Sequence, residues 1–224
     1  MAKVDFKKAL DGYQAKRGEF RIVEMPDMRY LMVDGQGDPN TSPEYTAALQ
    51  ALYPVAYTLK FASVRELGWD YVVPPLEGLW WADDMSSFTS ARDKSRWHWT
   101  MMLMVPDWVP PELVAAAVTK VAAKKDAPAR LHELRLEALT EGLCVQTLHV
   151  GSFDDEASVL AEMHDEFIPE AGLELTGTHH EVYFSDFRRV APEKLRTLLR
   201  QPVRWVGGEE RSGLIWATCE GVER

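Results

Sequence analysis

Two stretches of this sequence share one pattern: LMVDGQGDPNTSPEYTAALQAL, residues 31–52, and LHVGSFDDEASVLAEMHDEF, residues 148–167. Each begins with an apolar segment typical of a strand and continues through a glycine turn and a polar capping residue. Each then ends in a segment whose apolar residues recur at helical spacing. Because identity between the stretches is weak, the repeat is one of pattern. It predicts a strand, turn and helix that occur twice.

Further strands are predicted before the first copy of this strand, turn and helix pattern and after each copy. Extended pieces are expected at Phe20–Glu24 and Met28–Val33, before the first helix. That helix begins at Pro43, after a capping residue, with Pro54 as a kink or break. Aromatic and branched residues in DYVVPPLEGLWWADD, RWHWTMMLMVPD and THHEVYFSD predict one strand each.

Helices are predicted in the middle of the chain and between the strands of its second half. The segment PPELVAAAVTKVAAKKDAPARLHELRLEALTEG, residues 110–142, has the composition of two helices joined near Asp126–Pro128. The second copy of the helix is expected to end before Gly172. A short helix is predicted from Pro192 to near Pro202, and an edge strand at Leu214–Thr218.

These elements predict an α+β fold of two β-α-β-β modules related by pseudo-twofold symmetry. We expect an antiparallel sheet with helices on one face and a ligand cleft on the other. Residues 1–224 are expected to form a single domain. Its approximate halves are 20–109 and 143–203, with a helical connector at 110–142 and a C-terminal extension at 204–224.

Composition limits the class of protein. The net charge is −10, from 25 Lys and Arg against 35 Asp and Glu, which disfavours binding to nucleic acid or anionic lipid. The 2 cysteines have no CxxC spacing, and no apolar run is long enough for a signal peptide or a membrane span. We therefore expect a soluble cytoplasmic protein with no nucleic-acid or membrane partner, while the oligomeric state stays open.

An acidic residue in a predicted strand is the first candidate site. In HHEVYFSD, alternation puts His179, Glu181 and Tyr183 on one face and His180 and Val182 on the other. We expect Val182 to lie under the helices and Glu181 with Tyr183 to line the cleft, as candidate catalytic residues. The alternative is that Glu181 is solvated or pairs with an arginine such as Arg188.

An unusual number of aromatic residues supports a binding site. The candidate ligand-binding residues are Trp80, Trp81, Trp97, Trp99, Tyr45, Tyr53, Glu77 and Met102. Adjacent strand residues face opposite sides, so at least one of Trp80 and Trp81 should face the cleft. The alternative is that these are core aromatics. A carboxylate among aromatic rings suits a flat cationic compound, and also a general base. Since His179 and His180 face opposite ways, we expect no metal site, and no cofactor is indicated.

Several segments in order resemble the GyrI-like small-molecule-binding family. They include YLMVDGQGDPN, LYPVAYTLKF, DYVVPPLEGLWW, WHWTMMLMVPD, EGLCVQTLHVGSFDDE and HHEVYFSDFRRVAPEKLRTLLRQPV, which cover most of residues 30–203. The resemblance implies two fused β-α-β-β modules with a central glutamate, matched by Glu181, and surrounding aromatic residues. Related regulators join this domain to a helix-turn-helix domain, which we do not expect here because little sequence precedes the first strand. Other stand-alone members are hydrolases that open cyclopropanoid cyclohexadienones.

Two functions therefore remain open at the sequence level. The first is a small-molecule-binding protein for bulky aromatic, often cationic compounds. The second is a hydrolase that opens cyclopropanoid genotoxins, with Glu181 activating water and Tyr183 donating to the oxyanion. A third, a purely structural or partner-inhibiting protein, leaves the glutamate and the tryptophans unexplained.

Overall fold

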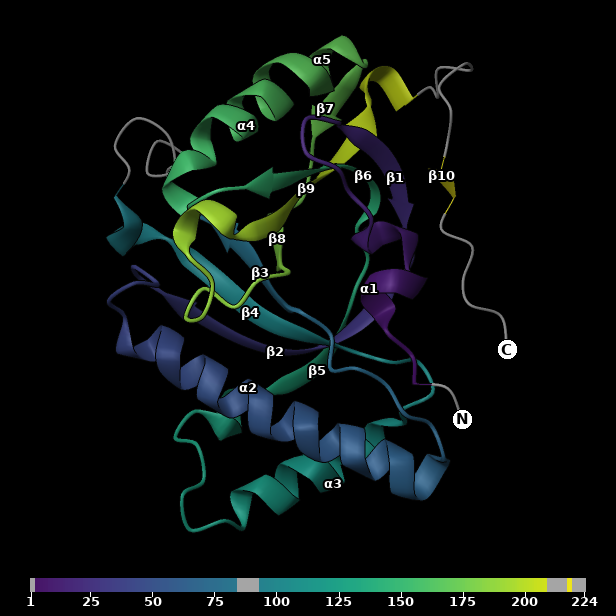
Figure 1. The fold of residues 1–224 in the computed structure, drawn as a ribbon, viewed down its shortest axis with the longest axis vertical. Helices are drawn as coiled ribbons and strands as arrows, with labels where there is room; N and C mark the ends of the chain where they lie inside the picture. The colour runs from purple at the N-terminus through teal and green to yellow at the C-terminus, as the bar shows by residue number, and fades with distance from the viewer. Residues whose placement is uncertain (1–2, 84–92, 209–216, 219–224) are drawn as a thin grey trace. The chain divides into compact units, whose positions relative to one another are not determined.

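Two units make up the chain in the computed structural model, which describes residues 3–83, 93–208 and 217–218 (Figure 1). The first unit contains Met1–Phe6 and Met28–Leu139, and the second contains Lys7–Asp27 and Thr140–Arg224. This division differs from the predicted halves. The strand near residue 21 belongs to the second unit, and most of the predicted connector belongs to the first.

The first unit is an antiparallel sheet with two helices. Its strands lie in the order β3-β4-β2-β5. Helix α2 packs on β2 and β4, and α3 packs on α2. The bounds are β2 (Met28–Gln36), α2 (Pro43–Ala62), β3 (Leu76–Trp81), β4 (His98–Val105), α3 (Pro111–Ala122) and β5 (Arg135–Leu139).

Helix α2 begins as the sequence predicts. The Ser42 hydroxyl accepts a hydrogen bond from the Tyr45 backbone N–H, and Pro43 occupies the first turn. Pro54 does not end the helix, which continues to Ala62. A π-helical turn at Ser63–Leu67 follows, and Gly68, at φ 74°, terminates it. Of the two alternatives predicted at Pro54, a kink or a break, the break is therefore wrong.

The second unit repeats this arrangement. Its strand order is β10-β1-β6-β9-β8, antiparallel except for the parallel pair of β1 and β10, and β7 pairs with β9. The bounds are β1 (Arg21–Met25), β6 (Gly142–Val150), β7 (Leu173–Leu175), β8 (His179–Tyr183), β9 (Arg196–Trp205) and β10 (Ala217–Thr218). The short helix α1 (Phe6–Ala9) precedes β1.

A helical segment covers one face of the second unit's sheet. It consists of α4 (Ala157–Ala161), a π-helical turn (Glu162–Phe167) and α5 (Ile168–Glu170). Met163 and Ile168 pack against Val145 and Leu199 in one buried cluster. Gly172, at φ 76°, lies just beyond its end, as the sequence predicts.

The order β3-β4-β2 in the first unit matches β8-β9-β6 in the second. In both units a helix follows the first strand and precedes the other two. The predicted α+β fold with a repeated β-α-β-β pattern is therefore confirmed. Among the helices that the structure describes, none is both long and apolar enough to cross a membrane.

Two predicted helices are strands. The second helix of the predicted connector is a 3-10 turn (Leu131–Glu133) followed by β5, which pairs with β2. The helix predicted from Pro192 is a 3-10 turn (Pro192–Lys194), and β9 then continues through Pro202. Strand pairing outweighs the helical propensity of Leu, Ala and Arg in both places. In the predicted edge strand, Ala217 and Thr218 form β10, and residues 214–216 lie outside the described part.

Candidate functional site

Strand β8 carries a carboxylate that is held by a phenol. The Tyr183 hydroxyl donates a hydrogen bond of 2.6 Å to Oε2 of Glu181. The other oxygen, Oε1, lies 3.6 Å from Nε2 of His179. The Glu181 side chain keeps 13% of its surface exposed. Glu181 is therefore positioned by a neighbour two residues away and remains partly accessible to solvent.

Within the second unit, a series of aromatic rings extends from Tyr183, the residue that binds this carboxylate. The ring of Phe153 meets that of Tyr183 edge to face, with centroids 5.8 Å apart. The ring centroid of Phe187, a residue that is 45% exposed, lies 6.5 Å from that of Phe153. Neither phenylalanine is among the residues predicted from the sequence. Phe153 lies in the turn after β6 and Phe187 in the loop after β8, so strand alternation gives no signal for them.

The Glu181 side of β8 is the side that the helices cover. Glu181 pairs in register with Leu199, and Leu199 belongs to the cluster that contains Met163 and Ile168. Val182 faces the other way. The prediction that Val182 lies under the helices and Glu181 on the opposite face is therefore wrong. Alternation fixes which residues share a face, but it does not say which face the helices cover. The alternative partner Arg188 binds Asp186.

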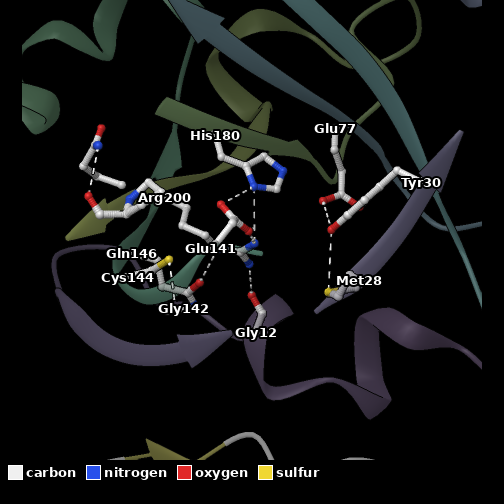
Figure 2. A network of polar contacts seen from close by, with 12 residues as sticks. Gly12, Met28, Tyr30, Glu77, Glu141, Gly142, Cys144, Gln146, His180 and Arg200 are labelled. Atoms are coloured by element: carbon white, nitrogen blue, oxygen red, sulfur yellow. Dashed lines mark hydrogen bonds and ion pairs between the residues drawn. The ribbon is translucent and has the colours of Figure 1, made fainter. Parts of the chain in front are cut away.

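The opposite face of the second unit's sheet holds a buried charge network (Figure 2). Oε1 of Glu141 lies 2.9 Å from Nδ1 of His180, and Oε2 accepts a bond of 3.0 Å from Nη1 of Arg200. Arg200 also donates to Oε1 of Gln146 at 3.1 Å and to the carbonyl of Gly12 at 2.6 Å. Burial alone would raise the pKa of Glu141, but His180 and Arg200 hold it at about 2. Through the bond from Arg200 to Gly12, the network attaches the segment before β1 to the sheet.

A second buried carboxylate, Glu77, lies in the first unit. It has no exposed surface, and its Oε2 is 3.4 Å from the Tyr30 hydroxyl, which is also 3.6 Å from the sulfur of Met28 (Figure 2). Met102 pairs in register with Glu77. The structure thus brings together the predicted residues Glu77 and Met102 and adds Tyr30, which the sequence analysis did not select. Methionine gives this carboxylate soft, apolar surroundings.

Two of the predicted aromatic residues, Trp80 and Trp99, lie beneath α2, and a third, Tyr45, projects onto them from α2 itself. Tyr45 packs edge to face on Trp99 at 5.3 Å and stacks on Trp80 at 6.4 Å. Trp99 is fully buried over Gly35, where an added Cβ would come within 2.1 Å of the indole ring. These contacts attach α2 to the sheet. Trp97 packs edge to face on Trp80 at 5.9 Å.

Two other predicted residues have different neighbours. Trp81 stacks on His98 at 5.7 Å and, as the next residue in β3, faces the opposite side from Trp80. Tyr53 stacks on Tyr57 along α2 at 6.5 Å. All eight predicted ligand-binding residues belong to the first unit, whereas Glu181 and Tyr183 belong to the second. Among the side chains that the structure describes, no group of three or more His, Cys, Asp or Glu could hold a metal ion.

Comparison with known proteins identifies the family. The model of the GyrI-like small molecule binding domain matches residues 18–204. A solved structure of an uncharacterized conserved protein from Listeria innocua is 41% identical, with a TM-score of 0.80, and the match covers 90% of this chain and 100% of that one. A hydrolase from Listeria innocua is 40% identical, with a TM-score of 0.78 and the same coverage.

More distant similarity concerns the fold alone. EcmrR, solved in a complex with DNA, is 11% identical, with a TM-score of 0.53, and the match covers 84% of this chain and 58% of EcmrR. None of the curated proteins matches the sequence significantly. The family match and the two Listeria structures agree with the repeated β-α-β-β architecture. The chain therefore belongs to the family of GyrI-like small-molecule-binding domains.

Proposed function

We propose that this protein binds bulky aromatic compounds that carry a positive charge, through Glu181 and the rings of Tyr183, Phe153 and Phe187. One observation supports this most directly: in a member of a small-molecule-binding family, a partly exposed carboxylate is oriented by a 2.6 Å hydrogen bond from Tyr183, whose ring packs on that of Phe153.

Charge and geometry favour a cation over a neutral or anionic compound. The faces of aromatic rings attract cations, and a carboxylate with limited access to water interacts more strongly with a nearby charge than one in bulk solvent. The chain also carries a net charge of −10, which raises the local concentration of cations.

The binding test compares two exposed phenylalanines. Phe187→Ala removes a ring of the proposed site, whereas Phe61→Ala removes a ring that is 54% exposed on α2 in the first unit. Binding of rhodamine 6G, a planar cation, is followed by fluorescence anisotropy. We expect Phe187→Ala to weaken binding about threefold to tenfold, and Phe61→Ala to leave it unchanged. Equal effects of the two variants would contradict the site.

The first unit contributes a second proposed contact surface. Glu77, Met102 and Trp81 are proposed to form a separate ligand-contacting surface within the first unit, since they share the side of that unit's sheet opposite Trp80 and Trp99. Trp80 and Trp99, on which Tyr45 of α2 packs, are proposed to support this surface from the other side of the sheet. Trp97 is proposed to lie at its margin, and Tyr53 is proposed to support it from α2, on the other side of the sheet. Glu77→Gln should then weaken cation binding less than Glu181→Gln does.

A second candidate function is hydrolysis of an electrophilic aromatic compound. It is favoured by 40% identity to a hydrolase from Listeria innocua and by the carboxylate and phenol of Glu181 and Tyr183. In this reaction Glu181 accepts a proton from water, and the water oxygen bonds to a cyclopropane carbon. The C–C bond breaks, its electron pair forms a phenolate on the former dienone, and the proton returns to that oxygen. The Tyr183 hydroxyl, which donates its one proton to Glu181 in this structure, would turn to donate to the developing negative charge once Glu181 has taken up the proton.

The hydrolase test uses a cyclopropane-bearing cyclohexadienone. Wild-type protein should convert it to a product heavier by one water molecule, detected by mass spectrometry. Glu181→Gln should abolish turnover and keep binding, because the amide cannot accept the proton. Conversion no faster than in buffer, at saturating substrate, would exclude this function and leave the binding function in place.

A further inference from the structure

Two histidines extend the polar side chains of β8 beyond Glu181. His179 lies next to Glu181 on the same face, with Nε2 at 3.6 Å from Oε1. The ring of His164 meets that of His179 edge to face, with centroids 6.1 Å apart. A row of polar side chains therefore runs from Tyr183 through Glu181 and His179 to His164.

The π-helical turn Glu162–Phe167 presents His164 to the strand. Such wide turns insert an extra residue into a helix and often occur at functional sites. Here the turn places Met163 in the buried core and His164 beside His179. In a regular α-helix, the side chains of Met163 and His164 would be separated by a different angle around the helix axis.

Several buried polar atoms in this row lack a hydrogen bond. They are Nε2 of His164, both ring nitrogens of His179 and Oγ1 of Thr197, none of which has a hydrogen-bond partner among residues 3–83, 93–208 and 217–218. Thr197 is 1% exposed and pairs in register with Tyr183. Buried polar groups are normally satisfied, so their grouping beside one carboxylate indicates that a bound polar group completes the arrangement.

The charges around the histidines restrict what can bind. Burial, together with the neighbouring His179, lowers the pKa of His164 to about 4, and Asp165 opposes this only in part. At neutral pH the His164 ring is therefore uncharged, and a neutral imidazole has one hydrogen-bond donor and one acceptor. The carboxylate of Glu181 repels anions. A hydroxyl or a carbonyl oxygen fits these constraints.

We propose that His164 and His179 form a hydrogen-bonding subsite that takes the hydroxyl or carbonyl group of an aromatic ligand bound at Glu181. The subsite rests on the proposed binding function and specifies its ligand class. It favours compounds with a polar oxygen on the aromatic ring over those with a purely hydrocarbon surface.

A matched pair of cations tests this selectivity. Tetraphenylphosphonium and (4-hydroxyphenyl)triphenylphosphonium differ by one hydroxyl, and their affinities are measured by isothermal titration calorimetry. Wild-type protein should bind the hydroxyl compound about threefold to tenfold more tightly. In His164→Phe and in His179→Phe the ratio of the two affinities should fall close to one. His132→Phe, at a histidine whose side chain is 78% exposed in the first unit, should keep the wild-type ratio.

The result that overturns the subsite is a wild-type ratio of one, or a ratio that both variants retain. A separate arm does not depend on cation binding. Phenol and toluene are titrated into protein labelled with ¹⁵N at histidine, and His164 and His179 are identified from their variants. Phenol, but not toluene, should shift the ring nitrogens of both residues. If phenol shifts neither, the subsite is wrong. If phenol shifts both and neither phosphonium binds, the subsite stands and the proposed cation binding fails.

Discussion

Arg200 shows how much one buried charge contributes to the second unit. The side chain has no exposed surface and reaches Glu141, Gln146 and the carbonyl of Gly12. Arg200→Met should lower the free energy of unfolding by about 3–5 kcal/mol, because Glu141 would be left buried without the guanidinium that donates to it. Urea denaturation measures the change.

The double variant Arg200→Met, Glu141→Gln provides the control. It removes both charges, so it should recover part of the lost stability. A double variant that is less stable than Arg200→Met alone would mean that the ion pair is not the reason for the loss.

Single residues differ in how far the sequence predicts them. Strand alternation correctly places His179, Glu181 and Tyr183 on one face, because their spacing is local. The network of Glu141, His180 and Arg200 could not be found in this way. In the sequence, His180 lies 39 residues after Glu141 and Arg200 lies 59 residues after it, so these residues meet only through strand pairing.

The segment from α4 to α5 contains a pH-sensitive element. The pKa of His164 is about 4 in the folded protein against an ordinary value of 6.5, so the unfolded chain takes up a proton first as the pH falls. The contribution of the neutral His164 ring to the free energy of unfolding is therefore complete above pH 6.5, the ordinary pKa of histidine. It is lost as the pH falls toward about 4, the pKa of His164 in the folded protein. Between pH 7 and pH 4 this loss should amount to about 3 kcal/mol.

His164→Phe isolates this contribution. Urea denaturation of wild type and variant at pH 7 and pH 4 gives the change in stability of each protein, and the wild type should lose about 3 kcal/mol more than the variant. Losses of the same size in both proteins would show that His164 does not carry the effect. Glu141, with a folded pKa of about 2, affects both proteins alike.

At the scale of elements, the sequence predicts α2 well and β5 and β9 poorly. Helix α2 has its own local start signals, Ser42 and Pro43. The residues of β5 and β9 have helical propensity, and only pairing with β2, β6 and β8 makes them strands. Interactions distant in sequence outweigh local preference in both strands.

At the scale of the whole chain, the repeated pattern of residues 31–52 and 148–167 correctly predicts two units of the same topology. The membership of each unit was not predictable in the same way. Strand β1 precedes the first unit's strands in sequence but pairs with β6 of the second unit. Pro26 and Asp27 separate the two strands locally, but no local signal assigns the strand that ends at Met25 and the strand that begins at Met28 to different units.

The central claim is that the charge of Glu181 selects cationic ligands. The measurement is isothermal titration of wild type, Glu181→Gln and Glu77→Gln at pH 8 with 10-methylacridinium, a planar cation, and acridine, its neutral counterpart. Glu181→Gln preserves the shape of the side chain and removes its charge. It should weaken binding of the cation by about 1–3 kcal/mol and change binding of acridine little, with a smaller effect from Glu77→Gln. Equal losses for the cation and for acridine in Glu181→Gln would contradict the claim.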